Sequence, residues 1–286
     1  MKNPFNITPK DRWQSYISQL RRKVLRDKEL YEHMLATEAS IDDLRSRQDV
    51  DESSIERFHD ERLTYAYRKV FSEPNPLVTV CIATFNRSEL LISRAVHSIL
   101  NQSYQNFQLI VVGDGCTDDT EVRMAALRDS RVQFINLQER GKYPEEPSLR
   151  WMVAGTYPMN TALSLAEGSF ITHLDDDDCH APQRIETLLR FIQEHQVDFV
   201  WHPFWTQGTN YRWRSNEAVH FKRGSVSTSS IFYHRWFKQI PWDIDAYRYR
   251  EPGDWNRLRK IRYLGARCKR HDGLLLQHFR ERSQKK

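Results

Sequence analysis

The chain has 286 residues, of which 39% are hydrophobic, and this is enough for one large domain or two small ones. Its four cysteines, Cys81, Cys116, Cys179 and Cys268, form no CxxC pair, so we expect no zinc or disulfide framework and favour a reducing, cytosolic compartment. There is no signal-peptide h-region and no run of 18 apolar residues, which predicts neither a secretory leader nor a membrane span.

The net charge of +5 is unevenly distributed along the chain. Residues 1–76 carry 14 basic and 14 acidic side chains, whereas residues 248–286 carry 13 basic and 4 acidic ones. A basic C-terminal region can meet nucleic acid, an anionic membrane face or a phosphorylated substrate, or it can simply be solvated. We expect no nucleic-acid partner, because no other feature of the chain calls for one.

Residues 1–72 predict a helical N-terminal extension. Apolar residues recur near helical spacing from Trp13 to Leu35, and glycine is absent from the whole region. We expect two or three amphipathic helices that pack on the main domain or on a second copy of the chain, which would make a homo-oligomer. The breaker SEPNP at residues 72–76 then marks a domain boundary.

From residue 77 onward, predicted strands and helices alternate with short connections. We expect strands at 77–85, 107–115, 131–137, 169–174 and 197–205, and helices at 88–102, 117–129, 160–168 and 181–195. This alternation is typical of an α/β fold with a mostly parallel sheet flanked by helices. Ligands of such sheets bind beyond the carboxyl ends of the strands, where Thr84, Asp114 and the run from Asp175 to Asp178 lie.

The run of four carboxylates from Asp175 to Asp178 follows the fourth predicted strand. Bunched carboxylates raise one another's pKa unless a divalent cation holds them ionised, and magnesium and manganese prefer oxygen ligands. Alternate side chains of an extended segment share a face, so Asp175 and Asp177 would point together, with Asp176 and Asp178 turned away. The alternative is a solvated acidic turn before the next helix.

Two stretches of the chain resemble glycosyltransferase family 2. They are VTVCIATFNRSELLISRAVHSILNQSYQNFQLIVVGDGCTDDT, which starts at Val78, and HLDDDD, which is followed by Pro182. The resemblance implies a GT-A domain, with its Rossmann-like sheet, over residues 77–280, divided into a nucleotide-binding half at 77–180 and an acceptor half at 181–280. It also implies an inverting enzyme that uses Mn²⁺ or Mg²⁺ to move a sugar from a nucleotide donor, most simply a UDP-sugar, to a glycan or lipid-linked acceptor.

The same resemblance implies roles for individual residues. Nucleotide binding falls to Thr84, Asn86, Arg87, Asp114, Asp175 and Asp176, and metal binding to Asp175, Asp177 and His278. A carboxylate at Asp114 suits N3–H of uracil, the only ring donor of that base. The family often has Arg-Asn where this chain has Met159-Asn160, so Arg150 or Lys142 would replace the missing arginine. Both lie in the loop 141–155, which could be a lid or plain surface.

The second half of the domain must supply a base and an acceptor site. Asp254 opens a predicted helix after a Pro-Gly turn, and the family places its catalytic acid at such a position; the alternative is that it only caps the helix. Tryptophans of this half could stack on sugar rings, although we expect at least two of them in the core. They are Trp201, Trp205, Trp213 and Trp236, and Trp205 and Asn160 are weaker donor or acceptor candidates.

The basic C-terminal region is compatible with a phosphate-bearing acceptor at the inner face of a membrane, so we expect a cytoplasmic enzyme that can lie against that face. Four residues on or near one helix carry this hypothesis, Arg257, Arg259, Lys260 and Arg262, followed by the basic tail 281–286. Two other readings stay open: a non-catalytic GT-A-like scaffold, and a nucleotidyltransferase. The latter usually carries a glycine- and arginine-rich first loop, which residues 84–87 do not supply.

Overall fold

A computed structural model of the chain describes residues 28–208 and 210–280. The chain divides into two compact units, one ending at Asp49 and one beginning at Val50. The predicted helical spacing from Trp13 to Leu25 and the basic tail 281–286 lie outside the described residues. Within the part that is described, no helix is both long and apolar enough to cross a membrane.

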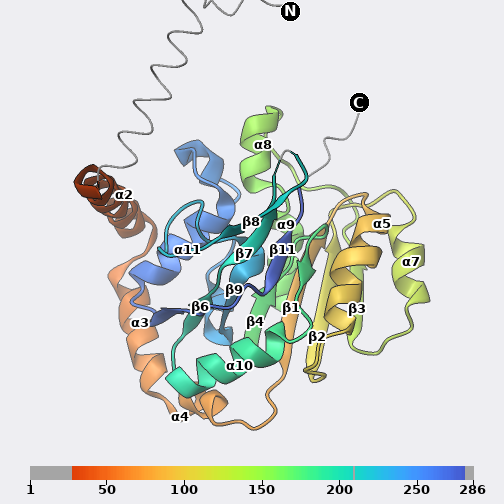
Figure 1. Cartoon of the computed structure of the whole chain (residues 1–286), viewed down its shortest axis with the longest axis horizontal. Coiled ribbons are helices and arrows are strands. Elements are labelled where there is room, and N and C mark those ends of the chain that lie inside the picture. The colour runs from red at the N-terminus through yellow and green to blue at the C-terminus, as the bar shows by residue number, and fades with distance from the viewer. Residues whose placement is uncertain (1–27, 209, 281–286) are drawn as a thin grey trace, which may run out of the picture. The chain divides into compact units, whose positions relative to one another are not determined.

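The elements of the two units follow in chain order (Figure 1). The first unit contains α2 (Lys28–Asp49). The helices of the second unit are α3 (Glu52–Leu63), α4 (Tyr65–Arg68), η1 (Lys69–Phe71), α5 (Ser88–Leu90), η2 (Leu91–Val96), α6 (His97–Leu100), α7 (Thr120–Ala126), α8 (Pro147–Val153), α9 (Thr156–Leu165), α10 (Arg184–His195), η3 (Thr228–Ser230), η4 (Arg235–Gln239), η5 (Ala246–Tyr249) and α11 (Gly253–Tyr263). Its strands are β1 (Val78–Thr84), β2 (Phe107–Gly113), β3 (Val132–Asn136), β4 (Phe170–His173), β5 (Cys179–His180), β6 (Phe199–Trp201), β7 (Phe204–Gln207), β8 (Trp213–Asn216), β9 (Ile231–His234), β10 (Cys268–Arg270) and β11 (Leu276–His278).

The main sheet has seven strands in the order β10-β6-β9-β4-β1-β2-β3. Strand β9 runs antiparallel to both of its neighbours, β4 and β6, whereas the other described pairs of this sheet are parallel. Helices flank the sheet, as Figure 1 shows. The mostly parallel α/β fold predicted from the alternation of elements is therefore confirmed, and β1 and β4, side by side at its centre, end at Thr84 and just before the four aspartates.

A second, smaller sheet has the order β5-β11-β7-β8. Strand β11 is antiparallel to β5 and parallel to β7, and β7 and β8 form an antiparallel pair. Because β5 begins at Cys179, directly after the aspartates, this sheet brings the end of the chain to the end of β4. His278, on β11, thereby reaches the acidic segment 100 residues earlier in the chain.

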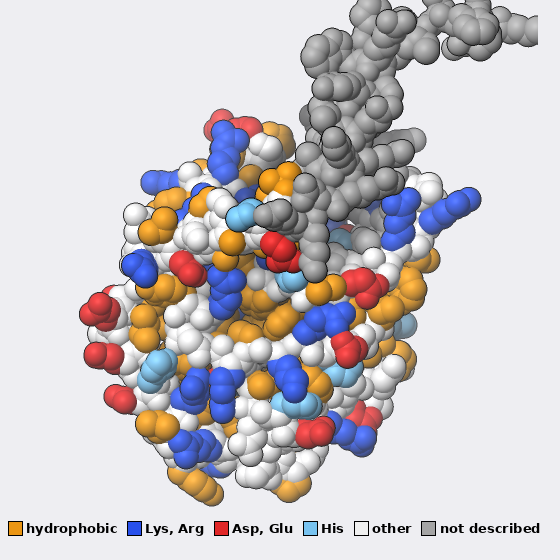
Figure 2. Space-filling view, turned by 60° about the vertical axis from the view of Figure 1, so that its left-hand side comes forward, with side chains coloured by type: hydrophobic (Ala, Val, Ile, Leu, Met, Phe, Trp, Pro, Cys, Tyr) orange, Lys and Arg blue, Asp and Glu red, His pale blue; other side chains and the backbone are white. Residues whose placement is uncertain are grey.

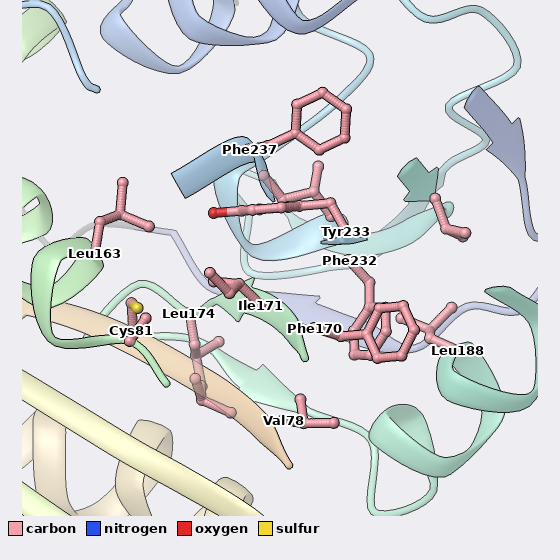
Figure 3. Packing of buried hydrophobic residues seen from close by; sticks show 14 of the residues in the cluster. Val78, Cys81, Leu163, Phe170, Ile171, Leu174, Leu188, Phe232, Tyr233 and Phe237 are labelled. Atoms are coloured by element: carbon pink, nitrogen blue, oxygen red, sulfur yellow. The ribbon is translucent and has the colours of Figure 1, made fainter. Parts of the chain in front are cut away.

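The core follows from the apolar runs of the central strands. Figure 3 shows Phe170 and Phe232 of neighbouring strands lying together, and their rings stack with centroids 5.7 Å apart. All four residues of β4 are buried, as expected for strands covered on both faces. This packing fixes the end of β4, and with it the position of the acidic segment.

Helices α3 and α4 of the predicted extension belong to the second unit, which begins at Val50. The ring of Phe58 on α3 lies 4.6 Å from that of Trp236 and 5.2 Å from that of Phe237. The hydroxyl of Tyr67 on α4 donates to the carboxylate of Asp198 at 2.8 Å. These two helices therefore pack on the main domain, which is one of the two roles expected for them.

Three predicted segments differ from the structure. The single strand expected at 197–205 is two strands, because Pro203 has no N–H to donate and the chain leaves the main sheet for the second sheet there. The loop expected at 141–155 contains α8, which begins at Pro147. Strand β9 was not expected in the main sheet, because its four residues follow a serine-rich stretch and give only a short apolar run.

Candidate active site

The four aspartates form a turn and not an extended segment, so the expected alternation of their side chains is wrong. The N–H of Asp178 donates to the carbonyl oxygen of Asp175 at 3.1 Å, and the chain turns at Asp176 and Asp177. The turn brings the carboxylates of Asp175 and Asp178 together, while the carboxylate of Asp177 lies 3.2 Å from the guanidinium of Arg87.

Asp175, Asp178 and His278 form a compact cluster, in which one ligand atom from each lies within 4.8 Å of the others. The carboxylate of Asp178 accepts hydrogen bonds from Nδ1 of His278 at 2.8 Å and from the N–H of Phe279 at 2.9 Å. Burial, and then the charge of Asp178, raise the pKa of Asp175 to about 8. Burial opposes the charged form of His278, but the bond to Asp178 outweighs it and raises the pKa of His278 to about 9. A site that stabilises protons in this way is short of positive charge.

The loop after β1 is tied to the acidic turn. The hydroxyl of Thr84 donates to Asp176 at 2.7 Å, and the guanidinium of Arg87 lies 3.4 Å from Asp176 and 3.2 Å from Asp177. Burial raises the pKa of Asp176 to about 6, although Arg87 and Thr84 act against the rise. Three of the residues predicted for nucleotide binding, Thr84, Arg87 and Asp176, are thus in direct contact.

The turn after β2 places Asp114 beside the same loop. Gly113 is required there, since a Cβ would lie 2.5 Å from Oδ1 of Asn136, the atom that accepts the N–H of Cys116. The carboxylate of Asp114 is buried and accepts the N–H of Gly141 at 3.0 Å. The N–H of Asp114 donates to the carbonyl of Thr84 at 2.8 Å, which joins the two loops.

An aromatic and cationic wall stands next to Asp114. The guanidinium of Arg140 lies 3.8 Å from the centre of the Phe85 ring and 3.9 Å from the Asp114 carboxylate. Asn86, the residue after Phe85, is bonded to the turn that follows β2. Its amide accepts the N–H of Thr117 at 2.8 Å, and its backbone has a φ of +50°, which asparagine tolerates better than most residues. Asn86 therefore shapes the loop through Thr117.

Asp254 lies in the first turn of α11, and Trp255, Leu258 and Ile261 behind it are buried as predicted. The helix cap is Pro252, so the alternative in which Asp254 is the cap does not hold. The carboxylate accepts the N–H of Trp255 at 2.6 Å, and burial raises its pKa. Neighbouring Glu251 is engaged in a buried ion pair with Arg259, at 2.8 Å, and is therefore a structural acid.

The remaining predicted contacts do not converge on the acidic turn. The side chain of Asn160 is bonded to both the N–H and the carbonyl of Trp242, at 2.8 and 2.9 Å, so it holds the chain before α11. Arg150 lies on α8, and no described contact joins it to the aspartates. Trp205 is 37% exposed on β7, and Trp213 is also 37% exposed, whereas Trp201 and Trp236 are core residues, as expected for two of the four.

Two of the four basic residues that the sequence places at a membrane face are not exposed. Arg257 and Arg259 are buried in α11 and bonded within the domain, because the helix packs that face inward. Lys260 is paired with Asp243 at 3.2 Å. On the face drawn in Figure 2, basic and acidic side chains are interspersed. Four charges close together in a helical sequence need not share a solvent face, and here they do not.

Three residues of the site were not predicted. Asp178 was assumed to turn away, Arg94 donates to the carbonyl of Asp177 at 3.1 Å, and the hydroxyl of Ser229 accepts the N–H of Asp175 at 2.9 Å. Asp178 could have been found by considering a turn, since a bond from residue i+3 brings the first and fourth aspartates together. Arg94 and Ser229 act on main-chain atoms, for which the sequence carries no signal.

The cluster is suited to a divalent cation. Two carboxylates and an imidazole are ligands that manganese accepts, and the oxygen donors also suit magnesium. Burial, and then the neighbouring carboxylate of Asp178, raise the pKa of Asp175, and a cation bound between the carboxylates would favour their ionised form. Because Nδ1 of His278 is hydrogen-bonded to the carboxylate of Asp178, Nε2 is the ring atom left to face a ligand.

Comparison with known proteins places this site in context. The family model described as "Glycosyltransferase like family 2" matches residues 74–236. WfgD of Escherichia coli, a UDP-Glc:alpha-D-GlcNAc-diphosphoundecaprenol beta-1,3-glucosyltransferase, is 28% identical over 57% of this chain and 55% of its own length. The matches to curated relatives cover from 16% to 55% of the relatives' length.

Solved structures share the fold, and two of them illustrate it. One is S. aureus TarS 1-349 in complex with UDP, with a TM-score of 0.56 and 19% identity over 71% of this chain and 60% of that one. The other is the mannosyltransferase PcManGT of Pyrobaculum calidifontis in complex with GDP-Man and Mn²⁺, with a TM-score of 0.52 and 16% identity over 77% of this chain and 64% of that one. At this level of identity the likeness concerns the fold, which is that of GT-A glycosyltransferases.

Proposed function

The chain belongs to glycosyltransferase family 2, whose model matches more than half of its residues, and from this premise we propose that it is an inverting, metal-dependent glycosyltransferase. It would transfer a sugar from a nucleotide donor, most simply a UDP-sugar, to a hydroxyl of a glycan or lipid-linked acceptor. The observation that carries the proposal is the acidic turn at the end of β4, with Asp175, Asp178 and His278 drawn together.

Asp175, Asp178 and His278 are the residues that would hold Mn²⁺ or Mg²⁺, with Asp177 joining them as the second acid of the family's DxD motif. A cation bound there would neutralise charge on the leaving diphosphate. For Asp177 to take part, its carboxylate must leave Arg87, 3.2 Å away. The guanidinium of Arg87, which also lies 3.4 Å from Asp176, would then be able to pair with the diphosphate, since arginine pairs well with phosphate oxygens. The fold neighbour PcManGT contains Mn²⁺ with its donor, which supports this reading.

The donor pocket would be formed by the loops after β1 and β2. Asp114 is a buried acceptor that suits N3–H of uracil, and the exposed side of the Arg140–Phe85 pair offers a flat surface beside it. Thr84 and Asn86 would shape the pocket around the base and ribose, and Asp176 would contact the ribose or sugar. A UDP donor is favoured because WfgD uses UDP-Glc and TarS binds UDP.

Asp254 would act as the general base that takes the proton of the acceptor hydroxyl. Burial raises its pKa toward the working range of a base, and the first turn of α11 holds it in place. The sugar would be displaced in one step with inversion. We expect Asp254→Asn to lower kcat for hydrolysis of the donor by about 10²–10⁴-fold, with UDP binding retained. Asp245→Asn, a half-exposed acid nearby in the chain, is the control.

The acceptor we propose is a sugar carried on a lipid diphosphate, since WfgD acts on GlcNAc-diphosphoundecaprenol. Such an acceptor would bring the protein to the cytoplasmic face of a membrane, where it would take part in polysaccharide assembly.

The deciding experiment is calorimetric titration of UDP and GDP, each with and without Mn²⁺. We expect Mn²⁺-dependent binding of UDP to the wild type and at least tenfold weaker binding to Asp177→Ala. The control is Asp60→Ala, which removes an exposed carboxylate on α3. If neither nucleotide binds with any metal, the protein is not a nucleotide-sugar enzyme and the acidic turn is only a turn.

A further inference from the structure

The second sheet has two faces of different chemistry. Residues directly paired between strands share a face, and side chains alternate along each strand. His278 pairs with Thr206, and Phe204, two residues earlier, is buried with its ring 6.1 Å from that of His278. This inner face therefore carries the side chain that belongs to the acidic cluster.

The outer face of the same sheet carries aromatic rings and uncharged polar groups. Trp205 pairs with Gln277 on one side and with Ser215 on the other, and Gln207 pairs with Trp213. The rings of Trp213 and Phe279 meet edge to face, with centroids 4.9 Å apart. The outer face is thus formed by Trp205, Gln207, Trp213, Ser215, Gln277, Phe279 and Cys179, which pairs with Gln277 and whose pKa burial raises to about 11, so none of the seven is charged at neutral pH.

These rings are available to a ligand. Trp205 and Trp213 are each 37% exposed, whereas Trp201 and Trp236 of the same half are only 8% exposed. Exposed tryptophans that lie close together on one face of a sheet are unusual on a surface that has no partner. Amides and a hydroxyl alternate with the rings, so flat apolar surface and hydrogen-bonding groups occur side by side.

The outer face is continuous with the acidic turn. The guanidinium of Arg94 lies 4.1 Å from the centre of the Phe279 ring and also donates to the carbonyl of Asp177. In addition, the N–H of Phe279 donates to Asp178. A ligand that lies along Trp205, Trp213 and Phe279 would therefore have one end at the edge of the proposed catalytic site.

The chemistry of the outer face selects one class of ligand. Nucleic acid and anionic lipid surfaces are met mainly by lysine and arginine, which none of the seven residues supplies; Arg94, against Phe279 at the edge of the face, is already bonded to Asp177. Sugar rings instead present C–H surfaces that cover aromatic rings, and hydroxyls that exchange hydrogen bonds with amides. We propose that this outer face binds neutral sugar residues of the acceptor glycan, on the side remote from the reacting hydroxyl; this inference rests on the proposed function.

The test is binding of the labelled full chain to an array of neutral and anionic oligosaccharides. We expect retention on neutral oligosaccharides, at least tenfold weaker for Trp205→Ala and for Trp213→Ala, and largely restored by Trp213→Tyr, which returns an aromatic ring. Trp151→Ala is the matched control, because Trp151 on α8 is 66% exposed and lies off this sheet. Thermal melting of each variant checks that it is folded.

Two parallel measurements separate this inference from the proposed function. UDP titration with Mn²⁺ should be the same in the tryptophan variants and in the wild type. If the wild type does not bind UDP, the proposed function is contradicted. If it binds UDP but retains no oligosaccharide, only the proposal that the outer face binds sugars is overturned. Equal retention of Trp213→Ala and wild type would also overturn it. A third result would overturn it as well: the wild type binds no sugar but floats with phosphatidylglycerol vesicles, and Trp213→Ala does not float. The outer face would then be a membrane contact.

Discussion

A single buried carboxylate, that of Asp198, and the cluster of aspartates after β4 lie at opposite ends of the main sheet, and their surroundings differ. Asp198 precedes β6, and its carboxylate accepts bonds from Tyr67, Arg62 and both the backbone and the side chain of Arg267, at 2.7–3.3 Å. The aspartates that follow β4 are bunched instead, with Arg87 and His278 as their charged partners. One end thus has a saturated carboxylate, and the other has more negative charge than its partners balance.

This difference separates a structural acid from a functional one. Asp198 joins α4 and the strand β10 region to β6, and each of its lone pairs has a donor, so nothing remains for a ligand. A shallow hollow lies beside it, lined by Arg62, Leu63, Arg68, Phe71, Ser72, Gln196 and Arg267. Since two of its three arginines are already bonded to Asp198, we regard the hollow as the surface of that network. The acidic turn, in contrast, is arranged for a positive charge that the chain does not supply.

The largest effect that we predict for this comparison is a loss of folding stability when Asp198 is replaced. We expect Asp198→Ala to lower the free energy of unfolding by about 2–3 kcal/mol, because it leaves Tyr67 and two arginines without their acceptor. The arginine side chains are 26% and 45% exposed and can regain water, so the loss falls below that of a fully buried pair. Denaturant unfolding measures it. UDP binding should be unchanged, and a variant that is fully stable but has lost UDP binding would reverse the two roles.

The sequence predicted the acidic turn at one end of the sheet but not the Asp198 network at the other. Apolar runs and short connections predict β1, β2 and β4, and the position of four aspartates after a buried strand predicts where a site should lie. Asp198 gives no comparable signal. It is a single acid before a strand, and its partners Arg62 and Arg267 lie 136 and 69 residues away in the chain. Long-range pairing of this kind depends on the tertiary fold and has no local pattern.

Within the candidate site, the sequence predicted which residues take part, but not where their side chains point. The choice of Asp177 over Asp178 as the partner of Asp175 depended on an extended backbone, and a single turn at Asp176 and Asp177 changed which side chains meet. Arg257 and Arg259 were assigned to a membrane face on charge alone, yet carbonyl groups and Glu251 hold them inside. The residue types in a sequence motif therefore predict which ligands a site can bind, but not which side chains meet.

The next effect in size concerns metal affinity. We expect Asp175→Asn to weaken Mn²⁺ binding by about 10–100-fold, since it removes one carboxylate ligand of a small cluster. Its stability at pH 8 should be equal to or above that of the wild type, because a carboxylate crowded by Asp178 has been neutralised. Titration of Mn²⁺ monitored by electron paramagnetic resonance measures the affinity, with exposed Asp60→Asn as the control. Unchanged affinity would place the metal elsewhere.

The smallest effect is the dependence of stability on pH. The pKa of Asp175 is raised from 3.8 to about 8 and that of His278 from 6.5 to about 9, so these two groups bind more protons in the folded protein than in the unfolded chain up to about pH 9. Buried histidines such as His173, His180 and His202 have lowered pKa values and act in the opposite direction, but above about pH 7.5 they are neutral in both states. Stability must then fall as the pH rises from about 7.5 to about 9. We expect a loss of about 1 kcal/mol between pH 7.5 and pH 9 without metal, kept small because His278 is partly exposed to solvent.

Manganese should cancel this fall, because a bound cation stabilises the deprotonated carboxylates that high pH produces. Melting curves at pH 7.5 and pH 9, with and without Mn²⁺, test this in the wild type and in Asp175→Asn. The dependence should be flatter in the variant, and it should persist in Asp198→Ala, whose lost carboxylate lies at the other end of the sheet. A wild type that becomes more stable toward pH 9 without metal would show that the acidic turn already has its counter-charge, and the contrast between the two ends of the sheet would disappear.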